Sequence, residues 1–205
     1  MEFSICKLPV LVFHKGVFKT PVFVSCINQV TIMNDPINNG SSKLVIIENE
    51  VGEIGVDDKL LKTGGYKVEN MFSGCVCCSM AGEIISGIVQ IQKDFNPEYL
   101  IIESSGVGYP NEIKENIKRS LGIDSKICTL IDAKRWKRIL IPMQTMLKDQ
   151  IVGSDYILVN KTDLVDAEML DFVDKSAQEF VPEAKLFNIC AMKEISSDII
   201  SDITQ

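Results

Sequence analysis

Three cysteines within four residues, Cys75, Cys77 and Cys78, are the part of this sequence best suited to specific chemistry. Thiolates are soft ligands, and at this spacing they can converge on one metal ion such as Zn(II), Co(II), Ni(II) or Cu(I). The motif supplies no fourth ligand, so the candidates are Glu50, water, a partner protein or the same motif of a second protomer in a homodimer. A site with three protein ligands is better suited to metal transfer than a closed structural site. The alternative is a group of buried or oxidised thiols without a metal, which would be a reactive liability.

The composition is typical of a globular domain and argues against several classes of protein. Of the 205 residues, 46 % are hydrophobic and 24 % are charged, and the net charge is −7. We expect no nucleic-acid or anionic-membrane partner, because each would need a basic surface. We also expect no membrane span, because no apolar run reaches the ~18–20 residues that would be needed. The amino-terminal residues do not resemble a signal peptide, and the seven cysteines are odd in number, which argues against a disulfide framework. We therefore expect the protein in the cytoplasm.

Short apolar runs alternate with segments of helical period along the chain. The runs are bounded by Gly, Asn, Asp or Pro and show little polar alternation, which is typical of parallel strands covered on both faces. The predicted strands are Leu8–Phe13, Lys43–Asn49, Tyr99–Glu103, Lys126–Asp132, Tyr156–Asn160 and Lys185–Cys190. The predicted helices are Pro21–Met33, Met80–Asp94, Asn111–Leu121, Ala133–Leu140, Gln144–Val152 and Ala167–Phe180. This order predicts one α/β domain over residues 1–205, with a mostly parallel sheet.

Polar motifs follow four of the predicted strands, where the ligands of parallel sheets bind. They are Phe13–Thr20, Glu48–Asp58, Glu103–Pro110 and Asn160–Asp163. Because the carboxyl ends of parallel strands lie at one edge of a sheet, we expect these motifs to converge on a single site.

The motif Asn160-Lys161-Thr162-Asp163 has the N-K-x-D pattern with which GTPases recognise guanine. The carboxylate of Asp163 can accept hydrogen bonds from both the N1–H and the 2-amino group of guanine, a donor pair that adenine lacks. The stem of Lys161 can lie along the plane of the base. The alternative is a strand-to-helix turn in which Asp163 caps the next helix.

Two acidic motifs suit a phosphate and magnesium site. Glu103 ends a predicted strand, where its carboxylate can hold Mg(II) or a water of its shell, and Gly106 permits close approach of a γ-phosphate. The stretch Glu48–Asp58 has five carboxylates in eleven residues, as expected for a loop ordered by nucleotide and metal. The alternatives are a helix-capping role for Glu103 and a solvated acidic loop.

The order of N-E-x-G-x-x-x-x-D, G-C-x-C-C, E-S-S-G-x-x-x-P and N-K-x-D resembles the CobW-type metallochaperone GTPases, which are related to the nickel-insertion proteins HypB and UreG. The resemblance runs from about Leu8 to Cys190. It implies a P-loop NTPase-like fold with helices on both faces of the sheet, and GTP or GDP bound with Mg(II). It further implies zinc, cobalt or nickel at the cysteine motif and a metal-receiving or corrinoid-related (cobalamin) partner. Longer family members carry a further C-terminal domain, and we expect this chain to be a short form without it.

The same resemblance implies roles for individual residues. Glu50 and Asp57 would lie in a switch loop and act in catalysis together with Glu103. Asn160, Lys161 and Asp163 would contact the guanine base, and Gly106 the γ-phosphate. Cys75, Cys77 and Cys78 would bind the metal.

The phosphate loop departs from the family pattern G-x-x-G-x-G-K-T-T, because this chain has F-H-K-G-V-F-K-T-P. Gly16, Lys19 and Thr20 match, and Lys19 would contact the β- and γ-phosphates and Thr20 the magnesium. Phe13 and Phe18 replace two glycines, and bulky residues in strained loop conformations cost on the order of 1–3 kcal/mol each. GTP hydrolysis therefore stays open. The alternatives are a non-hydrolysing metal carrier or sensor and a regulatory partner of an active homologue.

Overall fold

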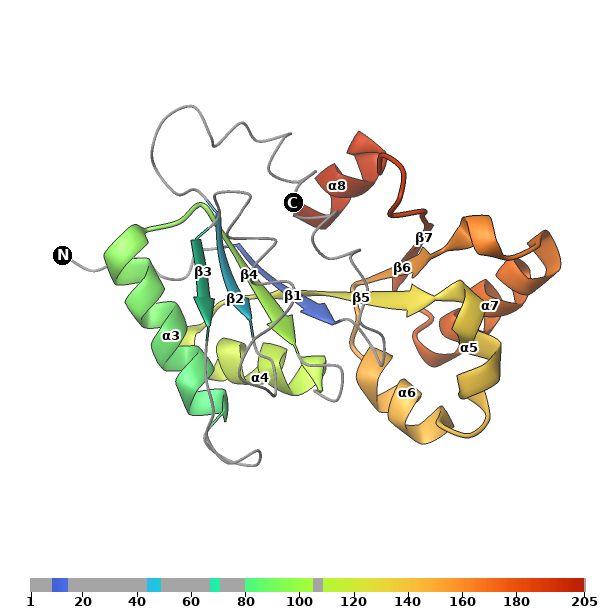
Figure 1. Cartoon of the computed structure of the whole chain (residues 1–205). Helices are drawn as coiled ribbons and strands as arrows, with labels where there is room; N and C mark the ends of the chain where they lie inside the picture. Colours follow the sequence, from blue (N-terminus) through green and yellow to red (C-terminus); the bar gives the residue numbers. More distant parts are fainter. Residues whose placement is uncertain (1–8, 15–43, 49–66, 71–79, 105–108, 205) are drawn as a thin grey trace.

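The computed structural model describes residues 9–14, 44–48, 67–70, 80–104 and 109–204 (Figure 1). Its strands are β1 (Val10–His14), β2 (Leu44–Glu48), β3 (Lys67–Asn70), β4 (Tyr99–Ser104), β5 (Lys126–Asp132), β6 (Tyr156–Asn160) and β7 (Lys185–Asn188). Its helices are α3 (Met80–Phe95), α4 (Pro110–Leu121), α5 (Ala133–Leu140), α6 (Gln144–Ile151), the short 3-10 helix η2 (Thr162–Leu164), α7 (Ala167–Phe180) and α8 (Ser197–Thr204). The strands form one seven-stranded sheet in the order β3-β2-β4-β1-β5-β6-β7.

All six strand pairs of this sheet are parallel, so the prediction of an α/β fold with a parallel sheet is confirmed. The six predicted strands are all present, with ends that differ by no more than a few residues. The helices α5 and α7 have the predicted bounds. The predicted helix Pro21–Met33 lies outside the described residues.

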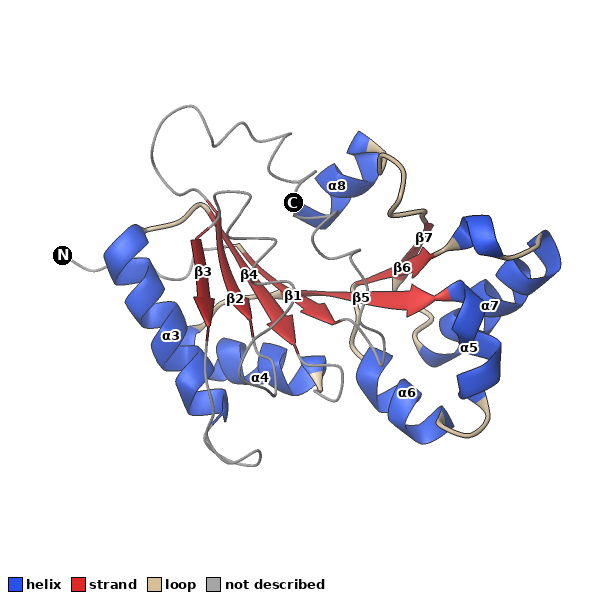
Figure 2. Ribbon diagram, viewed as in Figure 1, coloured by secondary structure: helices blue, strands red, loops and turns tan. Residues whose placement is uncertain are grey.

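The sheet is covered on both faces, as the apolar strands require. Side chains alternate along β1, so that Val10 and Val12 face one core and Leu11 and Phe13 face another. The first core includes side chains of α3 and α4, and the second includes side chains of α8. Figure 2 shows α8 on the opposite side of the sheet from α4 and α6. A third core lies under α5, α6 and α7 and contains the buried Trp136.

The strand β3 was not predicted from the sequence. It has four residues with the sequence KVEN, and among the described strands it pairs with β2 alone, at the edge of the sheet. An edge strand with one apolar residue has no hydrophobic run to reveal it.

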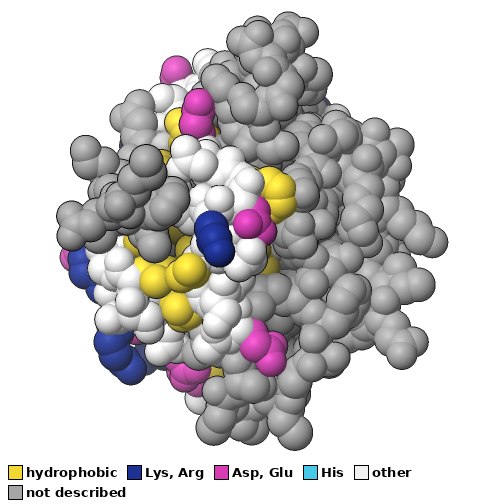
Figure 3. All heavy atoms as spheres, turned by 90° about the vertical axis from the view of Figure 1, so that its left-hand side faces the viewer, with side chains coloured by type: hydrophobic (Ala, Val, Ile, Leu, Met, Phe, Trp, Pro, Cys, Tyr) yellow, Lys and Arg dark blue, Asp and Glu magenta, His cyan; other side chains and the backbone are white. Residues whose placement is uncertain are grey.

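Beside this edge, Figure 3 shows hydrophobic side chains on the α3 side of the molecule, among acidic and basic ones. Val89 of α3 is one of the exposed hydrophobic residues.

Phe13 occupies a different environment from the one expected. The resemblance to the family pattern places it at the first glycine of the phosphate loop, where a bulky side chain would be strained. In the structure Phe13 belongs to β1, pairs with Glu103 and Cys128, and is 1 % exposed in the hydrophobic core. The expected strain at Phe13 is therefore wrong, because the strand continues through this position. Phe18 lies outside the described residues.

Helix α7 is capped by Asp166, whose carboxylate accepts a hydrogen bond from the backbone N–H of Met169 at 2.8 Å. Asp163 is therefore not the cap of this helix, and the capping alternative for its motif is wrong.

We expect Asp166→Ala to lower the free energy of unfolding by about 1 kcal/mol in chemical denaturation, since a cap satisfies an otherwise unpaired N–H group. The matched control Asp163→Ala should leave stability unchanged, and an equal loss in both variants would contradict this assignment.

Candidate functional site

The strand ends that carry the predicted motifs meet at one edge of the sheet. Glu103 at the end of β4 is in register with Glu48 of β2 and with Phe13 of β1. At the other half of the sheet, Asp132 of β5 is in register with Asn160 of β6. The predicted convergence of the motifs is thus present for the strands that carry them.

Only part of the predicted site falls in the described structure. Glu103, Asn160, Lys161 and Asp163 are described. The predicted residues outside the described ranges are Gly16, Lys19, Thr20, Glu50, Asp57, Cys75, Cys77, Cys78 and Gly106.

The loop after β6 is locked to the loop after β7 by hydrogen bonds. Asn160 is buried, and its Oδ1 accepts a hydrogen bond from the backbone N–H of Ala191 at 2.9 Å. Thr162 donates from Oγ1 to the carbonyl oxygen of Ile189 at 3.0 Å. The turn at Cys190 therefore lies beside the motif. Because two loops hold each other, the edge is organised before any ligand arrives.

Lys161 has a left-handed backbone conformation, with φ at 66°. Residues with a Cβ seldom adopt this region, and it persists where surrounding contacts impose it. Its Nζ donates to Oδ2 of Asp132 at 2.5 Å, and the Asp132 side chain is 2 % exposed. The other oxygen, Oδ1, accepts from the backbone N–H of Arg135 at 3.2 Å and caps α5.

Asp132 was missed in the sequence analysis, where it is only the last residue of a strand. A visible signal existed, since an aspartate directly before a helix is a typical cap. Its link to Lys161 joins residues 29 positions apart and depends on the register of β5 and β6.

Asp163 presents its carboxylate to solvent on η2. Within the described part of the chain, no hydrogen bond or ion pair engages this carboxylate. The buried Asn160 and the ion-paired Lys161 fix the loop, while Asp163 keeps both oxygens available to a ligand. This combination can bind a planar group that offers two adjacent N–H donors.

Glu103 is 1 % exposed at the end of β4, next to the ends of β1 and β2. A buried carboxylate is usually paired or coordinates a cation. The following helix α4 has Tyr109 as its N-cap, without a side-chain hydrogen bond, so the capping alternative for Glu103 is wrong. Among the described residues, no three His, Cys, Asp or Glu side chains are grouped so that they can hold a metal ion.

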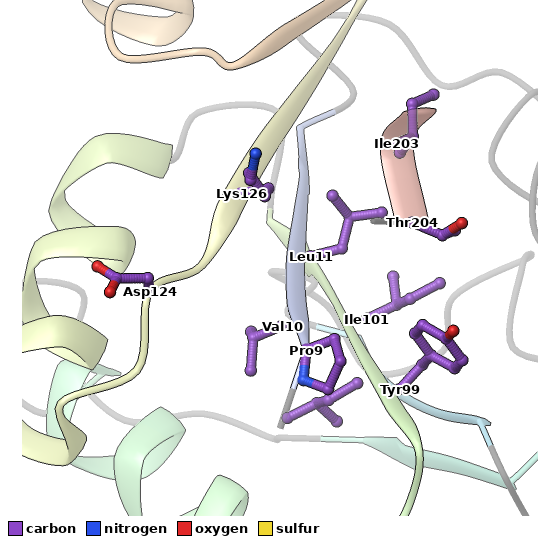
Figure 4. Close-up of a pocket in the computed structure, with 10 residues that line it drawn as sticks. Pro9, Val10, Leu11, Tyr99, Ile101, Asp124, Lys126, Ile203 and Thr204 are labelled. Atoms are coloured by element: carbon purple, nitrogen blue, oxygen red, sulfur yellow. The ribbon is translucent and has the colours of Figure 1, made fainter. Parts of the chain in front are cut away.

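A cavity of about 80 Å³ lies at the opposite end of the sheet, near the starts of β1, β4 and β5. Figure 4 shows Leu11, Ile101 and Ile203 together in its lining, with Tyr99 beside them. It contains none of the motif residues. The candidate site is therefore at the carboxyl edge and not at this cavity.

Comparison with known proteins decides the family. Residues 27–188 match the family model of the CobW/HypB/UreG nucleotide-binding domain. The chain belongs to the CobW/HypB/UreG family. The match begins after the altered phosphate loop and includes the cysteine motif and the N-K-x-D loop.

Curated relatives of this CobW/HypB/UreG chain are metal-handling proteins by name. The zinc-regulated GTPase metalloprotein activator 1 of Dictyostelium discoideum is 26 % identical over 82 % of this chain and 45 % of its own length. The zinc chaperone CobW of Sinorhizobium sp is 25 % identical over 71 % of this chain and 50 % of its own length. The chain spans half or less of the length of these two relatives.

Solved structures confirm the P-loop GTPase-type fold of the family. The hydrogenase maturation factor HypB from Archaeoglobus fulgidus aligns with a TM-score of 0.64 at 16 % identity, over 97 % of this chain and 89 % of that one. The Zn(II)-bound YjiA GTPase from E. coli aligns with a TM-score of 0.63 at 18 % identity, over 96 % of this chain and 62 % of that one. None of the helices that the structure describes is long and apolar enough to cross a membrane.

Proposed function

We propose that this chain is a metallochaperone-type protein that binds a guanine nucleotide at the carboxyl edge of its sheet and carries a metal ion at Cys75, Cys77 and Cys78. The observation that carries the nucleotide part is the loop Asn160–Asp163. It is tied to the neighbouring loop, its lysine is ion-paired, and its terminal carboxylate is exposed.

Each residue of this loop has a distinct role in base recognition. Asn160 holds the loop against Ala191 and does not need to touch the ligand. The stem of Lys161 covers one face of the base. Asp163 accepts hydrogen bonds from the N1–H and the 2-amino group of guanine. A base without these donors would strip water from the carboxylate and offer no hydrogen bond in return, so it would bind more weakly.

The phosphates would extend toward the ends of β1 and β4. Lys19 and Thr20 would hold them, with Gly16 and Gly106 allowing close approach of the backbone. The oxygen ligands of Thr20 and the buried Glu103 suit Mg(II), which prefers hard oxygen donors and would neutralise phosphate charge when bound. Glu50 and Asp57 would complete the switch loop.

Zinc is the first candidate for the cargo, because the relatives named above are zinc chaperones or zinc-regulated activators. Thiolates also bind cobalt and nickel, and a HypB neighbour from Helicobacter pylori was solved with nickel. A metal-receiving client, or a corrinoid-related one where cobalt is the cargo, would take the ion from the open coordination position. A change of nucleotide state that moves the switch loop would alter access to the cysteines.

A second candidate function is metal carriage without hydrolysis. It is favoured by Phe18 in the phosphate loop and by a family match that begins after this loop. The buried position of Phe13 removes one of the two objections to a working loop. We therefore propose nucleotide binding first and leave hydrolysis to measurement.

The test is a calorimetric titration of the purified chain with GTP, GDP and ADP, with Mg(II) and Zn(II) present or absent. We expect GDP and GTP to bind in preference to ADP, and zinc to bind in about one equivalent. Absence of guanine-nucleotide binding at millimolar concentration would refute the nucleotide function. Phosphate release from GTP separates the hydrolysing form from the carrier.

A further inference from the structure

We propose that Asp132 is a positioning residue of the base site, which acts through Lys161 and holds the lysine stem where it covers the bound base. This inference rests on the proposed guanine-nucleotide function. It assigns a role to a buried charge that no motif of the family pattern includes.

The carboxylate of Asp132 is fixed from two sides. The residue ends β5 in register with Asn160 of β6, so the strand pairing places it beside the base loop. Its Oδ1 accepts from the backbone N–H of Arg135 at the start of α5, at 3.2 Å. The sheet and the helix thus hold this side chain, which is 2 % exposed, without any help from a ligand.

This fixed carboxylate holds Lys161, a residue that otherwise has many conformations. The distance from Lys161 Nζ to Asp132 Oδ2 is 2.5 Å. Because the Asp132 side chain is buried, solvent screens the attraction between the two charges only weakly. A lysine side chain has four rotatable bonds, and fixing them at the moment of binding weakens affinity. Since the ion pair and the left-handed backbone at 66° already restrict Lys161, part of this ordering precedes ligand binding.

The chain offers a matched control at the opposite edge of the sheet, next to the start of β5. Asp155 Oδ2 accepts from Lys114 Nζ at 2.8 Å and from the backbone N–H of Ile127 at 2.7 Å. This carboxylate also joins a lysine and a backbone N–H, but it directly precedes β6 and lies beside the start of β5. A substitution there tests for a general effect on the sheet.

The deciding experiment measures GDP and IDP affinity of Asp132→Asn by calorimetry. Asparagine keeps the size and one acceptor oxygen but removes the charge, so Lys161 is released. We expect the Kd to rise about 10-fold, the effect of one newly mobile side chain. The rise should be equal for GDP and for IDP, which lacks the 2-amino group, because the lysine covers the base plane and does not read that group.

A double variant tests whether Asp132 acts through Lys161. In a Lys161→Met background, Asp132→Asn should cause no further rise in Kd. The single Lys161→Met variant leaves a buried charge unpaired, so adding Asp132→Asn should raise its melting temperature. This second measurement needs no ligand and remains informative where affinity is low.

Three results would overturn the inference while leaving the proposed function intact. They are unchanged GDP affinity in Asp132→Asn, an undiminished effect of this substitution in the Lys161→Met background, and an equal rise in Kd for Asp155→Asn. We expect Asp155→Asn to lower the melting temperature without a change in Kd. Failure of the unmodified chain to bind GDP would refute the proposed function and this inference together.

Discussion

Replacing Asp163 with alanine is expected to raise the Kd for GDP by about 100-fold or more. The exposed carboxylate would accept two hydrogen bonds from guanine, and hydrogen bonds to a charged group contribute about 1.5–3 kcal/mol each. Two such bonds correspond to about 10²–10⁴ in affinity at about 1.4 kcal/mol per tenfold. Calorimetric titration, or displacement of a fluorescent GDP analogue, measures the change.

The preference for guanine should fall with the affinity. Adenine offers no matching donor pair, so ADP binding should change little in Asp163→Ala. Asp163→Asn provides a sharper control, because its amide presents one donor and one acceptor and so matches the N1–H and 2-oxo group of xanthine. We expect this variant to lose GDP and to gain XDP. Retained GDP selectivity in either variant would show that another residue reads the base.

The framework of this fold could be predicted from the sequence because the inner strands β4, β5 and β6 are almost entirely buried. Runs such as Tyr156–Val159 are continuously hydrophobic, and such runs are recognisable without any long-range information. The edge strand β3 could not be found in this way. Among the described strands it pairs with β2 alone, and its sequence KVEN has one hydrophobic residue.

The candidate site could be predicted only where a motif is local. Asn160, Lys161 and Asp163 are adjacent in the sequence and are typical of a base-reading loop. Asp132 belongs to the same site through a strand register, which no local pattern encodes. Phe13 shows the opposite error, since the resemblance to the family's phosphate-loop pattern placed it in a loop and the continuing strand carries it into the core.

Replacing Cys75, Cys77 and Cys78 together with serine is expected to abolish stoichiometric zinc binding. A serine hydroxyl stays protonated at neutral pH and is a poor ligand, whereas a thiolate binds zinc strongly. Metal content after purification with zinc, together with competition against a chromophoric chelator, measures the loss. The variant should still bind GDP, because the base loop is built from β5, β6 and the loop after β7.

The matched control is Cys190→Ser, which changes a half-buried thiol next to the base loop. It should retain the full equivalent of zinc, since this cysteine belongs to a different part of the sequence from the motif. Zinc retained at full stoichiometry in the triple variant would refute the cargo site. Zinc lost in both variants would place Cys190 among the ligands and would join the metal site to the base loop. Zinc lost only in the triple variant, with GDP affinity unchanged, would show that the metal and the nucleotide bind at two separate sites. Two distinct sites are what coupling of metal binding to nucleotide state through the switch loop requires.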